Sequence, residues 1–367
     1  MKIVTSIASR ALICLGMLAF LVTCSAPPKM PAVDGAVIEI RRSDHALQAG
    51  DAGFSDQLQL YWFGSGCHLI QLGDVSVLTD PFVTNDLKAF GMASNPSRVE
   101  ATFGRISPPD AVLINHSHHD HILDAYPAMS LSQWNKRKVP LYGGRSALNL
   151  LAGFNHGEVD PRWHAVENGS RVRIAGTKPG YSAVVTAFRS NHGPHLKCGY
   201  TLANELISEP RKSPPSTLTD FQAGEVFNYL IELRAPGGIR FNVFYLGAPF
   251  HLDERPESLP PPGTRIDVAL ILAPTAENVR GYPGEHLARL RPKNIVFTHF
   301  NTFVKEDRDE QLAWGPFDFV NMPQLSREAQ ISFAKNVASH PEFEKLFIPA
   351  ITVIESNGDA RNVIRFR

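Results

Sequence analysis

Four histidines and one aspartate lie within six consecutive positions of this 367-residue chain, in the segment His116–His121. The segment directly follows Ala111–Ile114, an apolar run typical of a buried strand. A loop with no special role would more often contain Gly, Pro, Asn or Ser. Imidazole nitrogens beside a carboxylate are the ligands that a divalent metal such as zinc takes in proteins. The spacing His-x-His-x-Asp-His therefore predicts a metal site at the end of this strand.

Further histidines and a second aspartate also follow predicted strands. His192 comes off an expected strand at residues 182–188, in a Gly-Pro loop that also contains His195, and His299 follows an expected strand at residues 294–298. Asp80 ends another strand, just before a proline. Such a carboxylate is either a turn cap or a group that orients a metal-bound histidine, and beside the cluster we favour the second role.

The elements that must position these residues follow from the apolar runs and the turn residues between them. A first hairpin is expected around Gly73-Asp74, and a second joins residues 225–234 to residues 239–246. Further strands are expected at residues 111–114, 139–142, 171–174, 182–188, 267–272, 294–298 and 351–355, and helices within residues 83–105 and at 122–129, 146–153, 283–290 and 325–339. This pattern indicates an α/β (α+β) fold with two mainly antiparallel sheets packed together and flanked by helices.

The overall composition narrows the classes of protein. The 36 basic residues balance the 36 acidic ones, so no basic stripe favours a nucleic-acid partner. No internal repeat is visible, and the length allows a single sizeable domain.

The N-terminus has the features of a targeting segment. Lys2 and Arg10 precede an apolar run, Ala11–Val22, that is short for a membrane-spanning helix, and Cys24 follows. This resembles a bacterial lipoprotein signal, in which Cys24 would become the lipidated first residue. A secretory signal cleaved after Ala26 and an N-terminal membrane anchor are the alternatives. We expect a signal at residues 1–24, a linker at 25–53, one domain at 54–367, and a protein held in the bacterial cell envelope outside the cytoplasm.

Two cysteines, Cys67 and Cys198, lie in the expected domain. In an oxidising compartment they could pair, and the alternative is that both are free.

The motifs resemble those of a known family. The segment His116–His121 resembles the metal-binding motif of the metallo-β-lactamase superfamily. The stretch Leu78–Pro81 is similar to the start of the branch that contains L-ascorbate-6-phosphate lactonase and N-acyl-phosphatidylethanolamine phospholipase D. The resemblance spans about residues 56–305 and implies a four-layer αββα sandwich, metallo-β-lactamase-like.

The resemblance also implies two metal sites. His116, His118 and His192 would form the first site, with His192 preferred over His195 because it comes directly off its strand. Asp120, His121 and His299 would form the second site. The metal would be zinc, one or two ions per chain, with manganese or iron as alternatives.

One position departs from the family pattern. The family has an aspartate that bridges both metals after the strand ending at Leu246, whereas this chain has Ala248. A bridging carboxylate lies between two cations about 3.5–4 Å apart, so its loss should weaken the second site most. His251 is the possible substitute ligand. We expect His119 to point away from the metals.

The remaining histidines of interest, His68 and His286, are expected to be structural or surface groups. His68 lies in a predicted strand and His286 in a predicted helix.

These residues favour a hydrolase that uses metal-bound hydroxide on an ester, lactone, amide or phosphodiester, with Asp120 orienting the water. The substrate would be a small or lipid-like molecule. The alternative is a lipid-anchored, metal-binding protein without turnover, because Ala248 replaces the bridging carboxylate. A redox-active diiron site is a third and weaker hypothesis.

Overall fold

The computed structural model describes residues 57–84, 91–196 and 198–299, and the backbone of short strands at 41–42, 351–353 and 362–366. The predicted signal with Cys24 and the predicted helix at 325–339 lie outside the described residues. A two-residue strand, β1 (Arg41–Arg42), lies within the predicted linker. Among the described residues no helix is long and apolar enough to cross a membrane.

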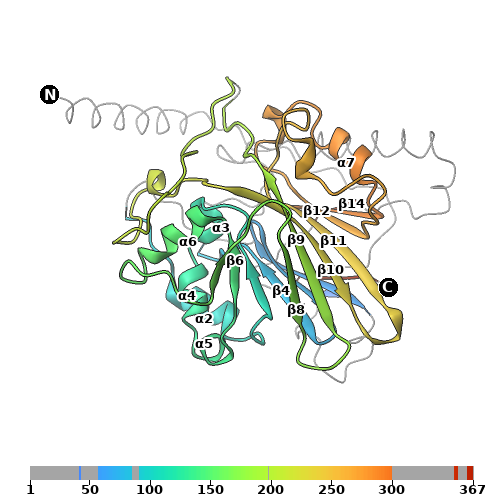
Figure 1. The fold of residues 1–367 in the computed structure, drawn as a ribbon, viewed down its shortest axis with the longest axis horizontal. Helices are drawn as coiled ribbons and strands as arrows, with labels where there is room; N and C mark the ends of the chain where they lie inside the picture. Colours follow the sequence, from blue (N-terminus) through green and yellow to red (C-terminus); the bar gives the residue numbers. More distant parts are fainter. Residues whose placement is uncertain are drawn as a thin grey trace.

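Two large sheets form the centre of the molecule (Figure 1). The first sheet has eight strands in the order β1-β15-β2-β3-β4-β5-β6-β7, and the second has seven in the order β14-β13-β12-β11-β10-β9-β8. The first contains β15 (Asn362–Phe366), β2 (Leu58–Gly64), β3 (Cys67–Leu72), β4 (Val75–Thr79), β5 (Ala111–Leu113), β6 (Leu141–Gly143) and β7 (Trp163–Ala165). The second contains β14 (Ile351–Val353), β13 (Asn294–Thr298), β12 (Val268–Leu272), β11 (Arg240–Leu246), β10 (Val226–Arg234), β9 (Ser182–Ser190) and β8 (Arg171–Ala175).

Both sheets are mixed, so the prediction of mainly antiparallel strands is wrong. The strands from β4 to β7 are parallel in the first sheet, and those from β11 to β14 are parallel in the second. In the described part of the chain, the reason is that long excursions of about 19 to 31 residues connect β4 to β5, β5 to β6, β6 to β7, β11 to β12 and β12 to β13. Such crossovers return the chain in the same direction, whereas tight turns reverse it.

The two predicted hairpins are present. Gly73-Asp74 joins β3 to β4, and residues 235–239 join β10 to β11. The apolar stretch that precedes the Gly73-Asp74 turn forms two strands, because Ser65-Gly66 makes a turn that separates β2 from β3. Strands β7 and β15 were not predicted.

The core lies between the facing sheets. Trp62 and Ile70 of the first sheet belong to the same buried cluster as Tyr229 and Leu270 of the second. Alternate residues of β3 point the other way: Leu69 packs in a second cluster beneath the helices. Apolar residues on both faces of a strand require cover on both sides, which explains the helices outside the sheets.

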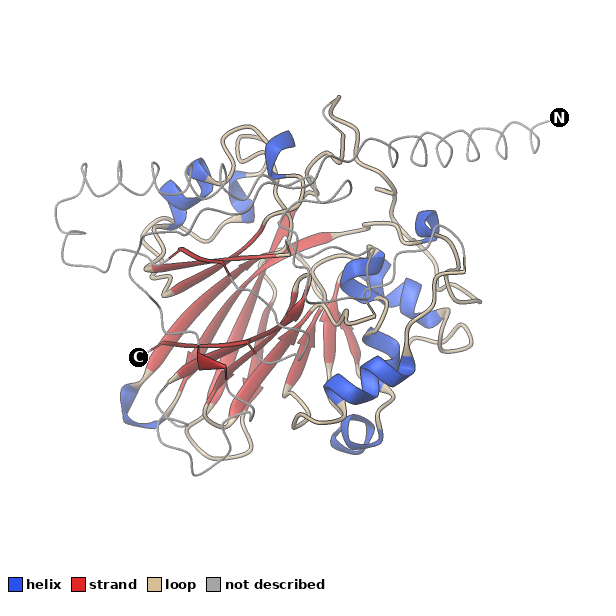
Figure 2. Ribbon diagram, turned by 180° about the vertical axis from the view of Figure 1, so that it is seen from behind, coloured by secondary structure: helices blue, strands red, loops and turns tan. Residues whose placement is uncertain are grey.

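Helices cover the outer faces (Figure 2). Those on the first sheet are α2 (Pro96–Phe103), α3 (His119–Ile122), α4 (Ala125–Met129), α5 (Ser132–Arg137) and α6 (Arg145–Ala152). On the second sheet, α7 (Gly284–Leu290) packs Leu287 and Leu290 into the core cluster. Each described helix that was predicted is present within a few residues; α5 was missed, and α3 begins inside the histidine cluster. The layers are helix, sheet, sheet, helix, as predicted.

Candidate metal centre

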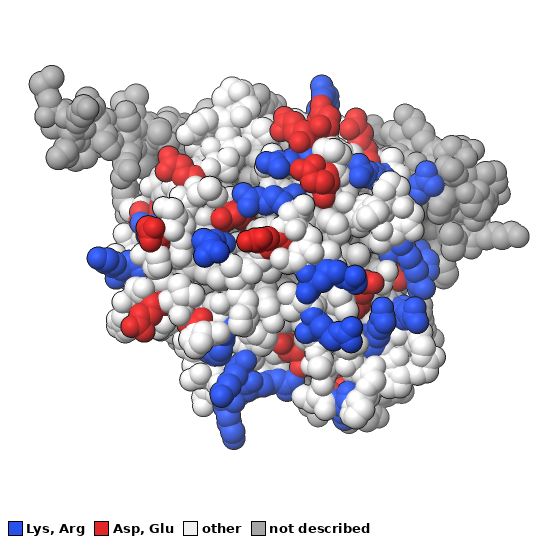
Figure 3. Space-filling model, viewed as in Figure 1, with Lys and Arg blue, Asp and Glu red and all other residues white. Residues whose placement is uncertain are grey.

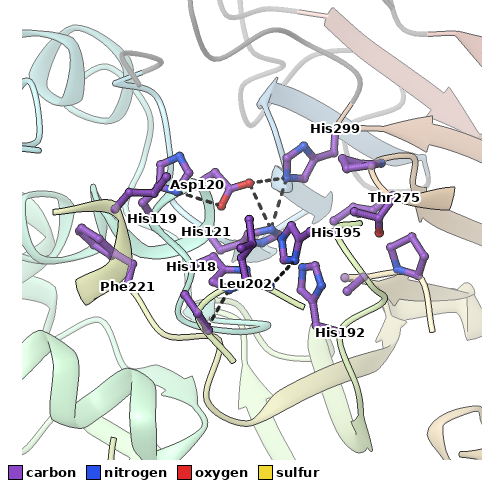
Figure 4. Close-up of a pocket in the computed structure, with 17 residues that line it drawn as sticks. His118, His119, Asp120, His121, His192, His195, Leu202, Phe221, Thr275 and His299 are labelled. Carbon is purple, nitrogen blue, oxygen red and sulfur yellow. Dashed lines mark hydrogen bonds and ion pairs between the residues drawn. The ribbon is translucent and has the colours of Figure 1, made fainter. Parts of the chain in front are cut away.

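The candidate site lies where several strands end at one edge of the two sheets. Strand β5 stops at Leu113, and the histidine cluster spans the following loop and the first turn of α3. His192 follows β9, and His299 follows β13 directly. Figure 4 shows these side chains converging on one pocket. Residues that are more than 180 positions apart along the chain are therefore brought together by the strand order, as the sequence predicted.

His116, His118 and His192 form the first group, as predicted. One nitrogen from each lies within 4.8 Å of the others. The nearest pair is His116 Nε2 and His118 Nδ1, which are 3.0 Å apart.

An oxygen atom faces the second nitrogen of each ring in this group. Asn115 Oδ1 lies 2.5 Å from His116 Nδ1, the carbonyl of Ala203 lies 3.2 Å from His118 Nε2, and the carbonyl of Gly193 lies 2.7 Å from His192 Nδ1. A carbonyl oxygen only accepts, so each ring must donate its N–H outward. The nitrogens that face one another are then unprotonated, which is the state a metal requires.

Burial keeps these rings neutral. It lowers the pKa of His118 to about 3, with His195 adding to the shift. Burial also lowers the pKa of His116 and His192 well below the usual value, and neighbouring histidines lower it further. Protons therefore do not compete effectively for these nitrogens near neutral pH.

Asp120, His121 and His299 form the second group, also within 4.8 Å of one another. Asp120 Oδ2 lies 3.0 Å from His299 Nε2 and 3.8 Å from His121 Nε2, and the two Nε2 atoms are 3.3 Å apart. Burial raises the pKa of Asp120, but the neighbouring His119, His121 and His299 outweigh it and hold the pKa well below its usual range. The carboxylate is ionised.

Asp80 holds His121 in place, in the position predicted for an orienting carboxylate. Its Oδ2 accepts from His121 Nδ1 at 2.6 Å and from the Tyr245 hydroxyl, and its Oδ1 accepts from the backbone N–H of Asn115 at 2.6 Å. Burial lowers the pKa of His121, but Asp80 and Asp120 more than offset this, and the pKa is raised. His121 Nε2 is thereby left facing Asp120.

The donor atoms fit a pair of divalent cations. Three neutral imidazoles converge in the first group, and two imidazoles and a carboxylate converge in the second. In the first group, unprotonated nitrogens 3.0 Å apart repel each other unless a positive charge lies between them. Nitrogen and oxygen donors of this kind suit zinc and also manganese or iron.

The other histidines have different surroundings. His195 Nδ1 accepts from the backbone N–H of Leu202 at 3.1 Å, and its ring stacks on His192 outside the first group. His251 does not line the pocket. His119 is outside both groups, although it lines the pocket, and its ring packs against Phe82 and Phe221.

His68 and His286 are buried structural residues. His68 Nδ1 lies 2.9 Å from the carbonyl of Gly66, and burial lowers the pKa of His68 to about 3. His286 packs between Phe250 and Tyr282, and burial lowers its pKa to about 4. Both were predicted to be structural or surface groups.

Cys67 and Cys198 do not form a disulfide with each other. Cys67 is buried in the first sheet and Cys198 is exposed. The alternative of a disulfide between them is not realised.

The pocket wall is mostly apolar beyond the metal groups. Its lining includes Leu202, Leu218 and Phe221, residues 247–249 after β11, and Leu272, Pro274 and Thr275 at and just after the end of β12. Ala248 is 2% exposed and lines the pocket where the family would have its bridging carboxylate. The contributions of Leu202, Phe221 and Thr275 were missed, because no local pattern distinguishes loop residues that line a pocket from other loop residues.

Facing sheets flanked by helices, with histidines and an aspartate at one sheet edge, define the metallo-β-lactamase fold. Residues 59–202 match the model of the β-lactamase superfamily domain.

Similar proteins include named hydrolases. The UPF0173 metal-dependent hydrolase of Polynucleobacter asymbioticus is 24% identical over 70% of this chain and 79% of its own length. A UPF0173 metal-dependent hydrolase of Methanopyrus kandleri is 34% identical over 34% of this chain and 56% of its own. The metallo-β-lactamase fold protein YhfI of Bacillus subtilis, a solved structure, shares 14% identity over 85% of this chain and 100% of its own, with a TM-score of 0.44.

Proposed function

We propose that the protein is a metal-dependent hydrolase in which His116, His118 and His192 hold one metal ion and Asp120, His121 and His299 hold a second. The observation that carries this proposal is the placement of an oxygen acceptor at the outer nitrogen of each ring in the first group. Three separate oxygen acceptors fix the N–H on the outer nitrogen of each ring, so three lone pairs face inward. A merely structural histidine cluster does not need this arrangement. The similarity to metal-dependent hydrolases supports the same class.

Zinc, the metal we favour, supplies a bound water of lowered pKa at neutral pH and polarises a carbonyl or phosphoryl oxygen. The chain's own part is to place and hold a proton. Asp120 is ionised, and its Oδ2 is shared with His299, so the carboxylate orients a water between the groups and accepts its proton. The apolar wall excludes bulk water and strengthens these interactions.

The substrate we propose is a small or lipid-like ester, lactone, amide or phosphodiester. The apolar lining supports an apolar acyl portion, and among the described residues no lysine or arginine lines the pocket. A nucleic-acid substrate is disfavoured, because acidic and basic side chains are interspersed on the face shown in Figure 3 rather than gathered in a basic stripe.

We also propose that lipid on Cys24 anchors the protein in the cell envelope. The support is the N-terminal sequence alone. Cys24→Ala should move the protein from the membrane fraction to the soluble fraction and abolish labelling by a radioactive fatty acid. An unchanged distribution and label would exclude lipidation at this residue.

A second candidate function is metal or ligand binding without turnover. The specific observation in its favour is Ala248, which gives the pocket lining a methyl group in place of the family's bridging carboxylate. The hydrolase is preferred because both ligand groups are otherwise complete.

Metal content and hydrolysis, measured together, test the proposal. The purified protein should hold zinc and hydrolyse p-nitrophenyl butyrate or bis(p-nitrophenyl) phosphate, and His116→Ala should lose both properties. His164→Ala, which changes an exposed histidine on β7, is the matched control and should lose neither. A metal-free wild type that matches His116→Ala would refute the metal site. A metal-loaded wild type without activity would favour the binding protein.

A further inference from the structure

Thr275 has no assigned role, yet it lies in the pocket wall. Apart from histidines and Asp120, it is the one polar side chain that lines the pocket in the described part of the chain. It follows β12 by three residues and begins the short turn at Ala276–Asn278. In Figure 4 it lies on the side of His192 and His195, across the pocket from Phe221.

The backbone of Thr275 is unusual. Its φ of 62° and ψ of 5° are in the left-handed region, where a β-branched residue is a genuine outlier. Asp80 and His299, which both belong to the site, are also non-glycine residues with positive φ, at 37° and 62°. Such conformations persist when the surrounding structure imposes them, and they cluster at functional sites.

The turn cannot easily relax, because it is fixed to the loop that carries His192. The Asn278 side chain donates to the carbonyl of Pro194 at 2.9 Å, and the Asn278 backbone N–H donates to the carbonyl of Thr275 at 2.9 Å. A Cβ added at Gly193 would lie 3.3 Å from Thr275 Oγ1. The hydroxyl therefore lies against the backbone next to a first-group histidine.

The Thr275 hydroxyl has no hydrogen-bond partner among the residues that the structure describes. The residue is 3% exposed, and its Oγ1 is buried without a partner. Leaving a buried hydroxyl unpaired is unfavourable. A valine of the same shape would avoid this, so the hydroxyl is explained best by a partner that arrives with the ligand.

We propose that the Thr275 hydroxyl positions the substrate by donating a hydrogen bond to a substrate oxygen beside the first histidine group. The inference rests on the proposed hydrolase function and narrows its substrate class. The apolar wall around this donor fits an ester or lactone whose acyl portion is short and uncharged, with its carbonyl or ring oxygen at Thr275. Thr275 acts by holding the substrate, and it transfers no proton.

The test compares Thr275→Val, which keeps the shape and removes the hydroxyl, with Thr275→Ser, which keeps the hydroxyl. Both variants should hold as much zinc as the wild type, and the valine variant should not melt at a lower temperature. With p-nitrophenyl butyrate, Thr275→Val should raise KM and lower kcat/KM about tenfold, the value of one hydrogen bond, with kcat nearly unchanged. Thr275→Ser should stay close to the wild type.

If turnover is too slow for KM to be measured, a binding measurement tests the same inference. Calorimetry then gives the affinity of the zinc-loaded protein for acetohydroxamate. The valine variant should bind it about tenfold more weakly than the threonine and serine proteins. Equal affinities and equal KM values for Val and Thr, or no binding by a zinc-loaded wild type, would overturn this inference alone. A wild type that holds no zinc would overturn the proposed function and this inference with it.

Discussion

Replacing Asp80 by asparagine should weaken the second metal group and spare the first. Asp80 is fully buried, and it accepts hydrogen bonds from three donors: the backbone N–H of Asn115 on Oδ1, and His121 Nδ1 and the Tyr245 hydroxyl on Oδ2. An asparagine must place its NH₂ at one of the two oxygen positions. The Asn115 backbone N–H cannot become an acceptor, so the NH₂ takes the place of Oδ2.

The consequence is a change of tautomer at His121. To accept from the new NH₂ group, the ring must move its proton from Nδ1 to Nε2, the nitrogen that faces Asp120 and His299. A protonated Nε2 cannot bind a metal. Loss of such an orienting partner typically costs 10–100-fold in metal affinity, or about 1.4–2.7 kcal/mol. The three acceptors of the first group do not involve Asp80, so we expect the first affinity to be unchanged.

A zinc titration in competition with a chelator checks this prediction, because it resolves two affinities. Asp124→Asn is the matched control. Asp124 is also a buried aspartate, and it accepts from the backbone N–H groups of Val83 and Thr84 and from the hydroxyls of Thr84 and Ser94. Both variants should lose about 2–4 kcal/mol of unfolding free energy. Only Asp80→Asn should weaken the second zinc; equal loss in both, or loss of the first zinc, refutes the reasoning.

Three further changes probe other parts of the site and core. Ala248→Asp should tighten binding of the second zinc in the same titration, and an unchanged stoichiometry would show that another ligand already fills that position. Gly247→Ala places a Cβ 1.8 Å from Asn115 Nδ2, so it should displace the acceptor of His116, weaken the first zinc and cost about 3 kcal/mol of stability in urea unfolding. His286→Phe removes a ring whose pKa is lowered from 6.5 to about 4 by burial. Stability from a neutral buried histidine is present above pH 6.5 and lost as the pH falls to 4, by about 3 kcal/mol, so the phenylalanine variant should lose less unfolding free energy across that interval. An identical pH dependence in both proteins would contradict this.

The six candidate ligands were predictable because strand ends give a local signal. Each lies in a segment that follows an apolar strand. Strand β9 runs in the same direction as β11 to β13, because β9 and β11 both pair antiparallel with β10, so these strands end at one edge of the sheet. His192 was also separable from His195 by its distance from the strand. In the described part of the chain, His192 and not His195 groups with His116 and His118.

Other features could not be read from the sequence. Mixed sheets depend on which strands become neighbours across long crossovers, and β7 and β15 are too short or too distant from their partners to carry a clear period. Two of the three acceptors that set the tautomers, the carbonyls of Ala203 and Gly193, are backbone atoms and have no residue type to recognise. The left-handed backbone of Thr275 leaves no trace either, because threonine is not expected there.

The two groups differ in the charge of the residues that would hold a metal. The second group contains Asp120 and is held by Asp80, so two negative charges would lie near a divalent cation bound there and would balance it locally. In the first group, by contrast, all three ligands are neutral, and the partners that orient them are uncharged oxygens. Ala248 lines the same pocket and adds no negative charge to it. The first group therefore keeps the better-defined nitrogen donors, while a cation held there carries its charge uncompensated. That excess positive charge favours a substrate whose oxygen becomes negative during hydrolysis, and the oxygen would lie on the side of the pocket where Thr275 is found.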